Sequence, residues 1–183
     1  MIYELKCGDV NNFATMVFSR ETEILDEYLD LNGEKINWKT PPVIEKYFDK
    51  RRKKQKERAD IGLLIPGTVI LSQKAHGVLA EYLGNFGELI QLACKDGDAW
   101  LYNVQTIIQC VDYDKSEKLH GSVIQEAFFE DNIPSKPCIF KDKHTANNRI
   151  YLNHAAKQDL VNIFQDANIT GWAIQPAGLS IFY

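Results

Sequence analysis

The stretch from Thr68 to Gly84 constrains the fold most, because a strand-like run leads there directly into a helix. Residues 68–71 are β-branched or apolar, which favours a β-strand. Ser72 follows as a candidate N-cap, and Gly84 stands where a glycine commonly ends a helix. Between them the apolar side chains recur at helical spacing, at Ala75, Val78, Leu79, Tyr82 and Leu83. The sequence therefore predicts a strand followed by an amphipathic helix that contributes to the core.

A second helix is predicted further along the chain. Asn153 can cap it, and its apolar side chains share one face, at Ala156, Leu160, Ile163, Phe164 and Ala167. Because a helix with one apolar face normally buries that face, we expect Leu160 and Phe164 to lie in the core.

Strand patterns account for much of the remaining chain. Residues 88–104, "ELIQLACKDGDAWLYNV", read as two strands joined by a turn that contains Asp96 and Gly97. Further strands are expected at residues 106–112, 138–142, 149–153, 170–175 and 179–182. The strands come in runs and do not alternate regularly with helices. The sequence thus predicts an α+β fold with a mostly antiparallel sheet and two main amphipathic helices.

The first third of the chain is less regular, and prolines interrupt it at Pro41, Pro42 and Pro66. We expect residues 1–66 to form an irregular N-terminal lobe and residues 67–183 to form the α+β core. One continuous domain is the alternative, because 183 residues suit a single domain that buries well over half of its unfolded surface.

The composition is that of a globular protein, with 45% hydrophobic and 25% charged residues. The N-terminus, "MIYELKCGDV", places Glu4 and Lys6 inside its apolar run and does not resemble a secretion signal. The apolar runs are also too short to span a membrane. Four cysteines lie far apart, at Cys7, Cys94, Cys110 and Cys138. This spacing favours free thiols in a reducing compartment, so we expect a cytoplasmic protein.

A basic segment contrasts with the net charge of -4: seven of the nine residues from Lys50 to Arg58 are Lys or Arg. We expect this segment to be an exposed helix end or loop, because so many neighbouring cations cannot all be paired when buried. A nucleic-acid module would spread its positive charge over one face and interleave aromatic side chains. Outside Asp49–Arg58 the chain has 14 basic and 23 acidic residues, a background that repels phosphate. Nucleic-acid binding through Lys50–Arg58 therefore remains an alternative function.

Candidate catalytic, metal and cofactor sites find little support in the sequence. The four histidines, at positions 76, 120, 144 and 154, do not have the spacing of a helical metal site. Residues 112–118, "DYDKSEK", begin like a calcium loop but place Glu117 where glycine is needed and lack the closing glutamate at Val123. The nucleophile-elbow, phosphate-loop and dinucleotide motifs are missing from the sequence. We therefore expect no enzyme and no cofactor, although a hydrolase assembled from dispersed His, Asp and Ser residues is a further alternative.

Three blocks of the sequence together resemble one protein family. They are "RADIGLL" with "TVILSQKAHGVLAEYL", then "GELIQLACKDGDAWLYNVQTIIQCVDYDKS", then "CIFKDKHTANNRIYLNHAAKQDLVNIFQDANITGWAIQP". In order and spacing these blocks are similar to the bacterial polymorphic-toxin immunity proteins of family eleven, over roughly residues 37–176. The positions that carry the resemblance are Ala59, Asp60, Ile61, Ser72, Gly87, Glu88, Asp112, Ser116, Thr170 and Gly171.

The resemblance implies a protein that binds and neutralises a cognate toxin encoded nearby. Catalytic residues do not define that family, so the resemblance provides no site residues for catalysis, cofactors or metals, and it leaves the partner-binding residues and the oligomeric state open. Trp172 departs from the family pattern, which has a smaller apolar residue there, and the first 36 residues lie outside the resemblance.

Overall fold

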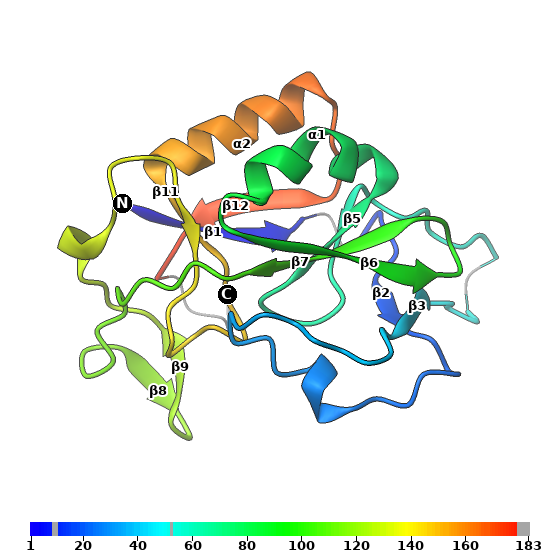
Figure 1. Cartoon of the computed structure of the whole chain (residues 1–183), viewed down its shortest axis with the longest axis horizontal. Helices are drawn as coiled ribbons and strands as arrows, with labels where there is room; N and C mark the ends of the chain where they lie inside the picture. Colours follow the sequence, from blue (N-terminus) through cyan, green and yellow to red (C-terminus); the bar gives the residue numbers. More distant parts are fainter. Residues whose placement is uncertain (9–10, 52, 179–183) are drawn as a thin grey trace.

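The computed structural model describes residues 1–8, 11–51 and 53–178. It consists of two larger sheets, one small hairpin and two helices that lie above the sheets in Figure 1. The predicted α+β class with a mostly antiparallel sheet is confirmed. Within the described ranges, no helix has the length and apolar content that a membrane crossing requires.

The first sheet has four antiparallel strands and contains the N-terminal strand in its interior. Its order is β10 (Ile139–Phe140), β11 (Tyr151–Asn153), β1 (Ile2–Cys7) and β12 (Trp172–Pro176). Strand β1 thus joins two strands from the far end of the sequence.

The second sheet has six strands, all antiparallel to their neighbours except for the parallel pair β3 and β6. Its order is β2 (Met16–Phe18), β3 (Val43–Lys46), β6 (Gly87–Cys94), β7 (Ala99–Val104), β5 (Val69–Ser72) and β4 (Ile61–Gly62). The small hairpin joins β8 (Glu117–Leu119) to β9 (Ser122–Gln125), and two short 3-10 turns span Asp26–Tyr28 and Glu130–Asn132.

Both predicted helices are confirmed, together with their caps. Helix α1 spans Gln73–Leu83 and helix α2 spans His154–Asp166. The Ser72 hydroxyl accepts a hydrogen bond from the Ala75 amide, and the Asn153 side chain accepts one from the Ala156 amide. Gly84 ends α1 in a right-handed conformation, with φ of -59°, and not in the left-handed one that a glycine permits.

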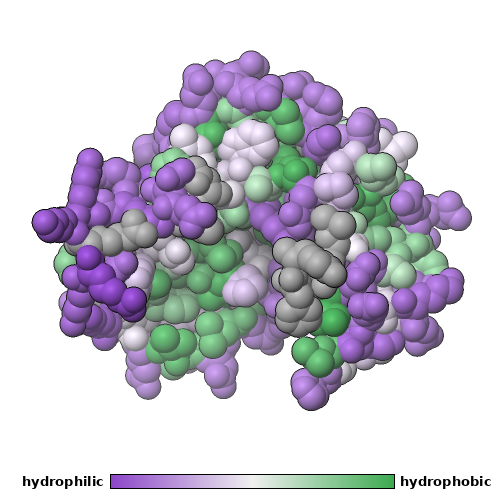
Figure 2. All heavy atoms as spheres, turned by 180° about the vertical axis from the view of Figure 1, so that it is seen from behind, coloured by the Kyte–Doolittle hydropathy of each residue, from purple (hydrophilic) through white to green (hydrophobic). Residues whose placement is uncertain are grey.

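The two helices share one core with the sheets. Leu79 of α1 and Leu160 and Phe164 of α2 are at most 1% exposed, and Tyr102 of β7 is fully buried in the same cluster. The burial predicted for Leu160 and Phe164 is therefore confirmed. From behind, apolar side chains also gather in one area of the lower half of the molecule, with hydrophilic side chains around them (Figure 2).

The prediction of a strand at residues 106–112 is wrong. The segment forms only isolated bridges, between Ile107 and Lys141 and between Val111 and Phe128. Part of the reason is a buried carboxylate, because Asp142 accepts hydrogen bonds from the Cys110 and Val111 amides at 2.8 and 2.9 Å. A side chain thus takes the place of a neighbouring strand. The strand expected at residues 179–182 lies outside the described residues.

Residues 1–66 do not make a sheet of their own. Each of the two larger sheets contains strands from both sides of Pro66: β1 lies in the first sheet, and β2, β3 and β4 lie in the second. Strands from the two sides of Pro66 therefore interleave in both larger sheets.

Candidate functional site

Asp60 connects three distant parts of the chain. Its Oδ1 accepts a hydrogen bond from the Ser72 hydroxyl at 2.9 Å, and its Oδ2 accepts from the amide and the hydroxyl of Thr170, each at 3.0 Å. Lys74 Nζ lies 3.4 Å from the same Oδ2. Burial alone would raise the pKa of Asp60, but the hydrogen bonds from Thr170 and Ser72 outweigh it and lower that pKa below its ordinary value. Asp60 therefore holds α1 and the chain before β12 in place.

Two glycines allow close backbone contacts, one beside Thr170 and one at the start of β6. Gly171 has φ of 83°, and a Cβ there would collide with the Ile61 carbonyl oxygen and with Ala59. A Cβ at Gly87 would collide with the Asn103 carbonyl oxygen across the hairpin. Both positions therefore require glycine for packing.

The remaining positions of the family resemblance also have internal partners. Glu88 Oε1 accepts from the Ile36 amide at 2.7 Å and from the Asn103 side chain at 3.0 Å. The Ser116 hydroxyl donates to the Asp112 carbonyl oxygen at 2.6 Å. We call the ten positions the framework residues: Ala59, Asp60, Ile61, Ser72, Gly87, Glu88, Asp112, Ser116, Thr170 and Gly171. The contacts of these positions therefore lie within the fold.

The basic segment is a loop and not a helix end. Hydrogen bonds between Asp49 and Gln55 close it at its base, both at 3.0 Å. Lys50, Arg51, Lys53 and Lys54 are exposed, as expected, whereas Arg52 lies outside the described residues.

The expectation of exposure is wrong for Arg58. Its guanidinium donates to the Asp98 carbonyl oxygen at 2.7 Å and to the Leu71 carbonyl oxygen at 2.8 Å. Burial lowers the pKa of Arg58 from its usual value. Arg58 therefore secures the loop to the second sheet, because these carbonyl groups lie within reach of its long side chain.

Two exposed aromatic side chains precede the basic loop. Tyr47 is 59% exposed and Phe48 is 63% exposed, directly after the end of β3. The Tyr47 amide donates to the Thr15 carbonyl oxygen at 2.8 Å, which fixes the chain at this point. A cavity of about 140 Å³ lies beside Tyr47. We define the aromatic-cationic surface as Tyr47, Phe48, Lys50, Arg51, Lys53 and Lys54.

Sequence reasoning missed the aromatic part of this surface. The pattern of Lys50–Arg58 predicts an exposed run of cations and does not include the two rings that precede it. The signal was present in two adjacent large side chains, Tyr47 and Phe48, that follow the strand "VIEK" and precede a polar loop. Such a pair at a strand end must place at least one ring outside the core, because neighbouring side chains of a strand alternate in direction.

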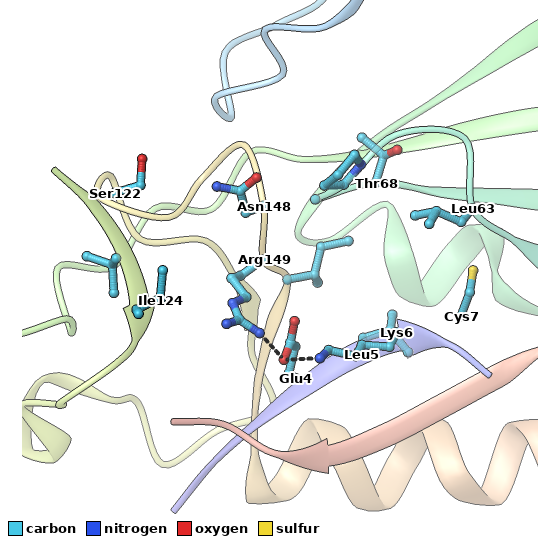
Figure 3. Close-up of a pocket in the computed structure, with 14 residues that line it drawn as sticks. Glu4, Leu5, Lys6, Cys7, Leu63, Thr68, Ser122, Ile124, Asn148 and Arg149 are labelled. Carbon is cyan, nitrogen blue, oxygen red and sulfur yellow. Dashed lines mark hydrogen bonds and ion pairs between the residues drawn. The ribbon is translucent and has the colours of Figure 1, made fainter. Parts of the chain in front are cut away.

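A second candidate site is a pocket of about 380 Å³ between β1, β9 and the loop before β5 (Figure 3). Figure 3 shows the Arg149 guanidinium turned towards Glu4 of β1, with Ile124 on one side of the pocket and Leu63 on the other. The pocket walls are mainly apolar and come from Leu5, Leu63, Pro66, Val123, Ile124 and Ile150.

Two of the lining residues, Glu4 and Arg149, are buried charged residues, and Arg149 also pairs with the buried Glu126 behind it. We call Glu4, Glu126 and Arg149 the ion triplet. Arg149 Nη1 lies 2.7 Å from Glu4 Oε2, and Arg149 Nε lies 2.7 Å from Glu126 Oε1. Burial would lower the pKa of Arg149, but the hydrogen bond and charge of Glu4 outweigh it and raise that pKa. The Tyr151 hydroxyl also donates to Glu126 Oε1, at 3.0 Å.

The ion triplet keeps two buried polar atoms without a hydrogen-bond partner among the described residues, Arg149 Nη2 and Glu126 Oε2. Lys6 Nζ lies 3.2 Å from Glu4 Oε2 and adds a second positive charge. The triplet was not predictable from local pattern, because its members are far apart in the sequence and come together only when β1 pairs with β11.

The four histidines are not brought together. His76 stacks on Trp100, His144 stacks on Tyr113, His120 is exposed, and His154 Nδ1 lies 3.4 Å from the Tyr3 hydroxyl. In residues 1–8, 11–51 and 53–178 there is no group of three His, Cys, Asp or Glu residues arranged to hold a metal ion.

No family model matches the chain, and a search of curated proteins found no match.

Proposed function

We propose that this chain is a cytoplasmic immunity protein that binds and neutralises a bacterial toxin encoded near its own gene. The sequence resemblance motivates the proposal. The internal contacts of the framework residues support it, because a family that shares a framework can vary its exposed surface to fit different toxins. Such a protein acts by binding and not by turnover.

The observation that carries the proposal is the aromatic-cationic surface. Tyr47 and Phe48 each expose more than half of their surface, beside four exposed cations. Aromatic and arginine side chains provide much of the binding energy at protein interfaces. Positive charges around them accelerate association with a negative partner surface. The toxin therefore presents an acidic face at this contact, with an apolar site for the aromatic rings.

Nucleic-acid binding is the second candidate, and one observation favours it. Cations beside exposed aromatic rings can track a phosphate backbone while a base stacks on a ring. Against it stands the acidic remainder of the chain, with 23 acidic and 14 basic residues outside Asp49–Arg58. Hydrolase activity has less support, because Asp60 and Ser72 are bound to each other within the framework and the histidines lie apart.

Growth of a bacterial host tests the proposal. The C-terminal domain of the large protein encoded beside this gene is expressed alone and together with this chain. We expect the domain to stop growth, and co-expression of the wild-type chain to restore it. The chain and the domain should also co-purify. If the domain is toxic and the chain neither restores growth nor co-purifies with it, the proposed function is wrong.

A further inference from the structure

We propose that the pocket between β1, β9 and the loop before β5 binds a compact, uncharged, largely apolar molecule that carries one hydrogen-bond acceptor. The proposal is independent of toxin binding, because it rests on a different part of the molecule. The pocket volume of about 380 Å³ falls in the range of small-molecule sites, which are typically lined by apolar groups with a few polar ones.

The shape of the pocket follows from the elements that build it. Strand β1 provides Leu5, strand β9 provides Val123 and Ile124, and the chain before β5 provides Leu63 and Pro66. These side chains form an apolar wall over which a ligand loses contact with water. Burial of apolar ligand surface favours binding, before the costs of association are subtracted.

The charges at the pocket select an uncharged ligand. Glu4 and Glu126 carry two negative charges, and Arg149 and Lys6 carry two positive ones, so the group is balanced. A ligand carboxylate would add a negative charge beside two buried glutamates. A ligand ammonium would add a positive charge beside Arg149. Both additions are costly where the surroundings exclude water.

The Arg149 guanidinium is the reason why we expect the ligand to carry a hydrogen-bond acceptor. Arg149 lines the pocket and is only 4% exposed, and its Nη2 has no partner among the described residues. A buried donor without an acceptor destabilises the folded protein. Nη2 is itself covered in this structure, so a ligand carbonyl would satisfy that donor once the side chains over it move aside. Ser122 and Asn148 are exposed and also line the pocket, so they provide its polar rim.

Fluorescence titration with three matched naphthalene dyes tests this chemistry. All three dyes share a dimethylaminonaphthalene ring system and differ in one substituent. That substituent is a propionyl group in the first dye (the ketone), a propyl group in the second and a carboxylate in the third. We expect the ketone to bind with a blue-shifted emission and about tenfold more tightly than the propyl dye, because a hydrogen bond to a charged donor is worth about 1.5–3 kcal/mol. The carboxylate dye should bind more weakly than the ketone.

Variants of the β8–β9 hairpin locate the binding. Ile124→Trp fills the pocket from its wall and should weaken ketone binding at least about tenfold. Leu119→Trp is the control, because Leu119 lies on the partner strand of the same hairpin, is 47% exposed and is not among the lining residues. It should leave binding unchanged. Arg149→Lys keeps the charge, and in a folded variant it should reduce the preference for the ketone over the propyl dye.

Several results would overturn the inference. Equal affinity for the ketone and the propyl dye would mean that Arg149 does not bind the acceptor, for example because water joins Nη2 to Glu126. Tighter binding of the carboxylate would refute the charge argument. Undiminished binding to Ile124→Trp, or no dye binding at all, would refute the site. If Arg149→Lys does not fold, the wild-type dye comparison and Ile124→Trp still decide the matter. Growth rescue by the chain is read separately, so failure of either proposal is recognised independently.

Discussion

Lys141 is fully buried, and its ammonium donates a hydrogen bond to the Leu31 carbonyl oxygen at 2.6 Å. It thereby ties the chain beside the first sheet to a segment more than a hundred residues earlier. Burial lowers the pKa of Lys141 to about 8, because the interior disfavours the charged form. The stability of the protein should therefore depend on pH through this side chain.

The sign of that dependence follows from the lowered pKa. Near pH 7 both the folded and the unfolded chain carry the proton. Between about pH 8 and 10.5 the unfolded chain still binds a proton that the folded chain has lost, so the free energy of unfolding rises with pH. Over this window the wild type should gain up to about 3 kcal/mol relative to Lys141→Met. Urea unfolding of both proteins at several pH values measures the difference.

Other groups titrate in the same range but affect both proteins alike. Burial raises the pKa of the Cys7 and Cys110 thiols to about 12, which lowers stability as the unfolded thiols ionise above their ordinary pKa. Only the difference between wild type and variant is therefore diagnostic. Lys143→Met removes an exposed neighbouring lysine and keeps Lys141, so this control should retain the pH dependence of the wild type. A difference between wild type and Lys141→Met that stays constant with pH would contradict the account.

At the scale of elements, α2 shows how a local pattern specifies both a helix and its buried face. Phe164 is 1% exposed and packs against Trp172 of β12 in a tilted arrangement, with ring centroids 4.8 Å apart. Phe164→Ala should lower the free energy of unfolding by about 3–5 kcal/mol, because it leaves a cavity between helix and sheet. Asn162→Ala, at an exposed position of the same helix, should change it by at most about 0.5 kcal/mol. Chemical denaturation provides both values. A similar small change for both variants would mean that this face of α2 is not the core.

Local patterns predicted the elements whose partners are close in sequence. The caps at Ser72 and Asn153 and the hairpin across Asp96 and Gly97 depend on neighbouring residues, and all three are confirmed. The strand expected at residues 106–112 failed because the distant Asp142 binds its backbone amides. The place of β1 between β11 and β12 was equally beyond a local pattern, because its pairing spans almost the whole chain.

The same distinction applies to the candidate sites. The cations of the basic loop are contiguous in the sequence, so the sequence alone identifies them. The role of Arg58 depends on carbonyl groups of Leu71 and Asp98, which only the folded sheet brings near it. The ion triplet likewise requires three distant segments. Sequence alone could therefore nominate a charged segment but not the pocket.

At the scale of the whole molecule, the framework residues are distinct from the aromatic-cationic surface and from the pocket. The framework residues have internal contacts, the aromatic-cationic surface faces solvent at the end of β3, and the pocket opens between β1 and β9. The net charge of -4 does not reveal the aromatic-cationic surface, because four exposed cations lie together on an otherwise acidic chain. The proposed contact with a toxin depends on that local arrangement and not on the total charge.

The most direct measurement of the central claim is the affinity of the purified chain for the toxin domain encoded beside it, at about physiological ionic strength. Tyr47→Ala with Phe48→Ala should weaken binding at least about tenfold, mainly through faster dissociation. Lys50→Glu with Lys53→Glu should mainly slow association. Val78→Ala, at an exposed apolar position of α1, should bind like the wild type. Equal affinity of all four proteins for the domain would contradict the assigned surface. An undetectable wild-type affinity, together with sub-micromolar, salt-sensitive binding of DNA or RNA, would contradict the proposed function itself.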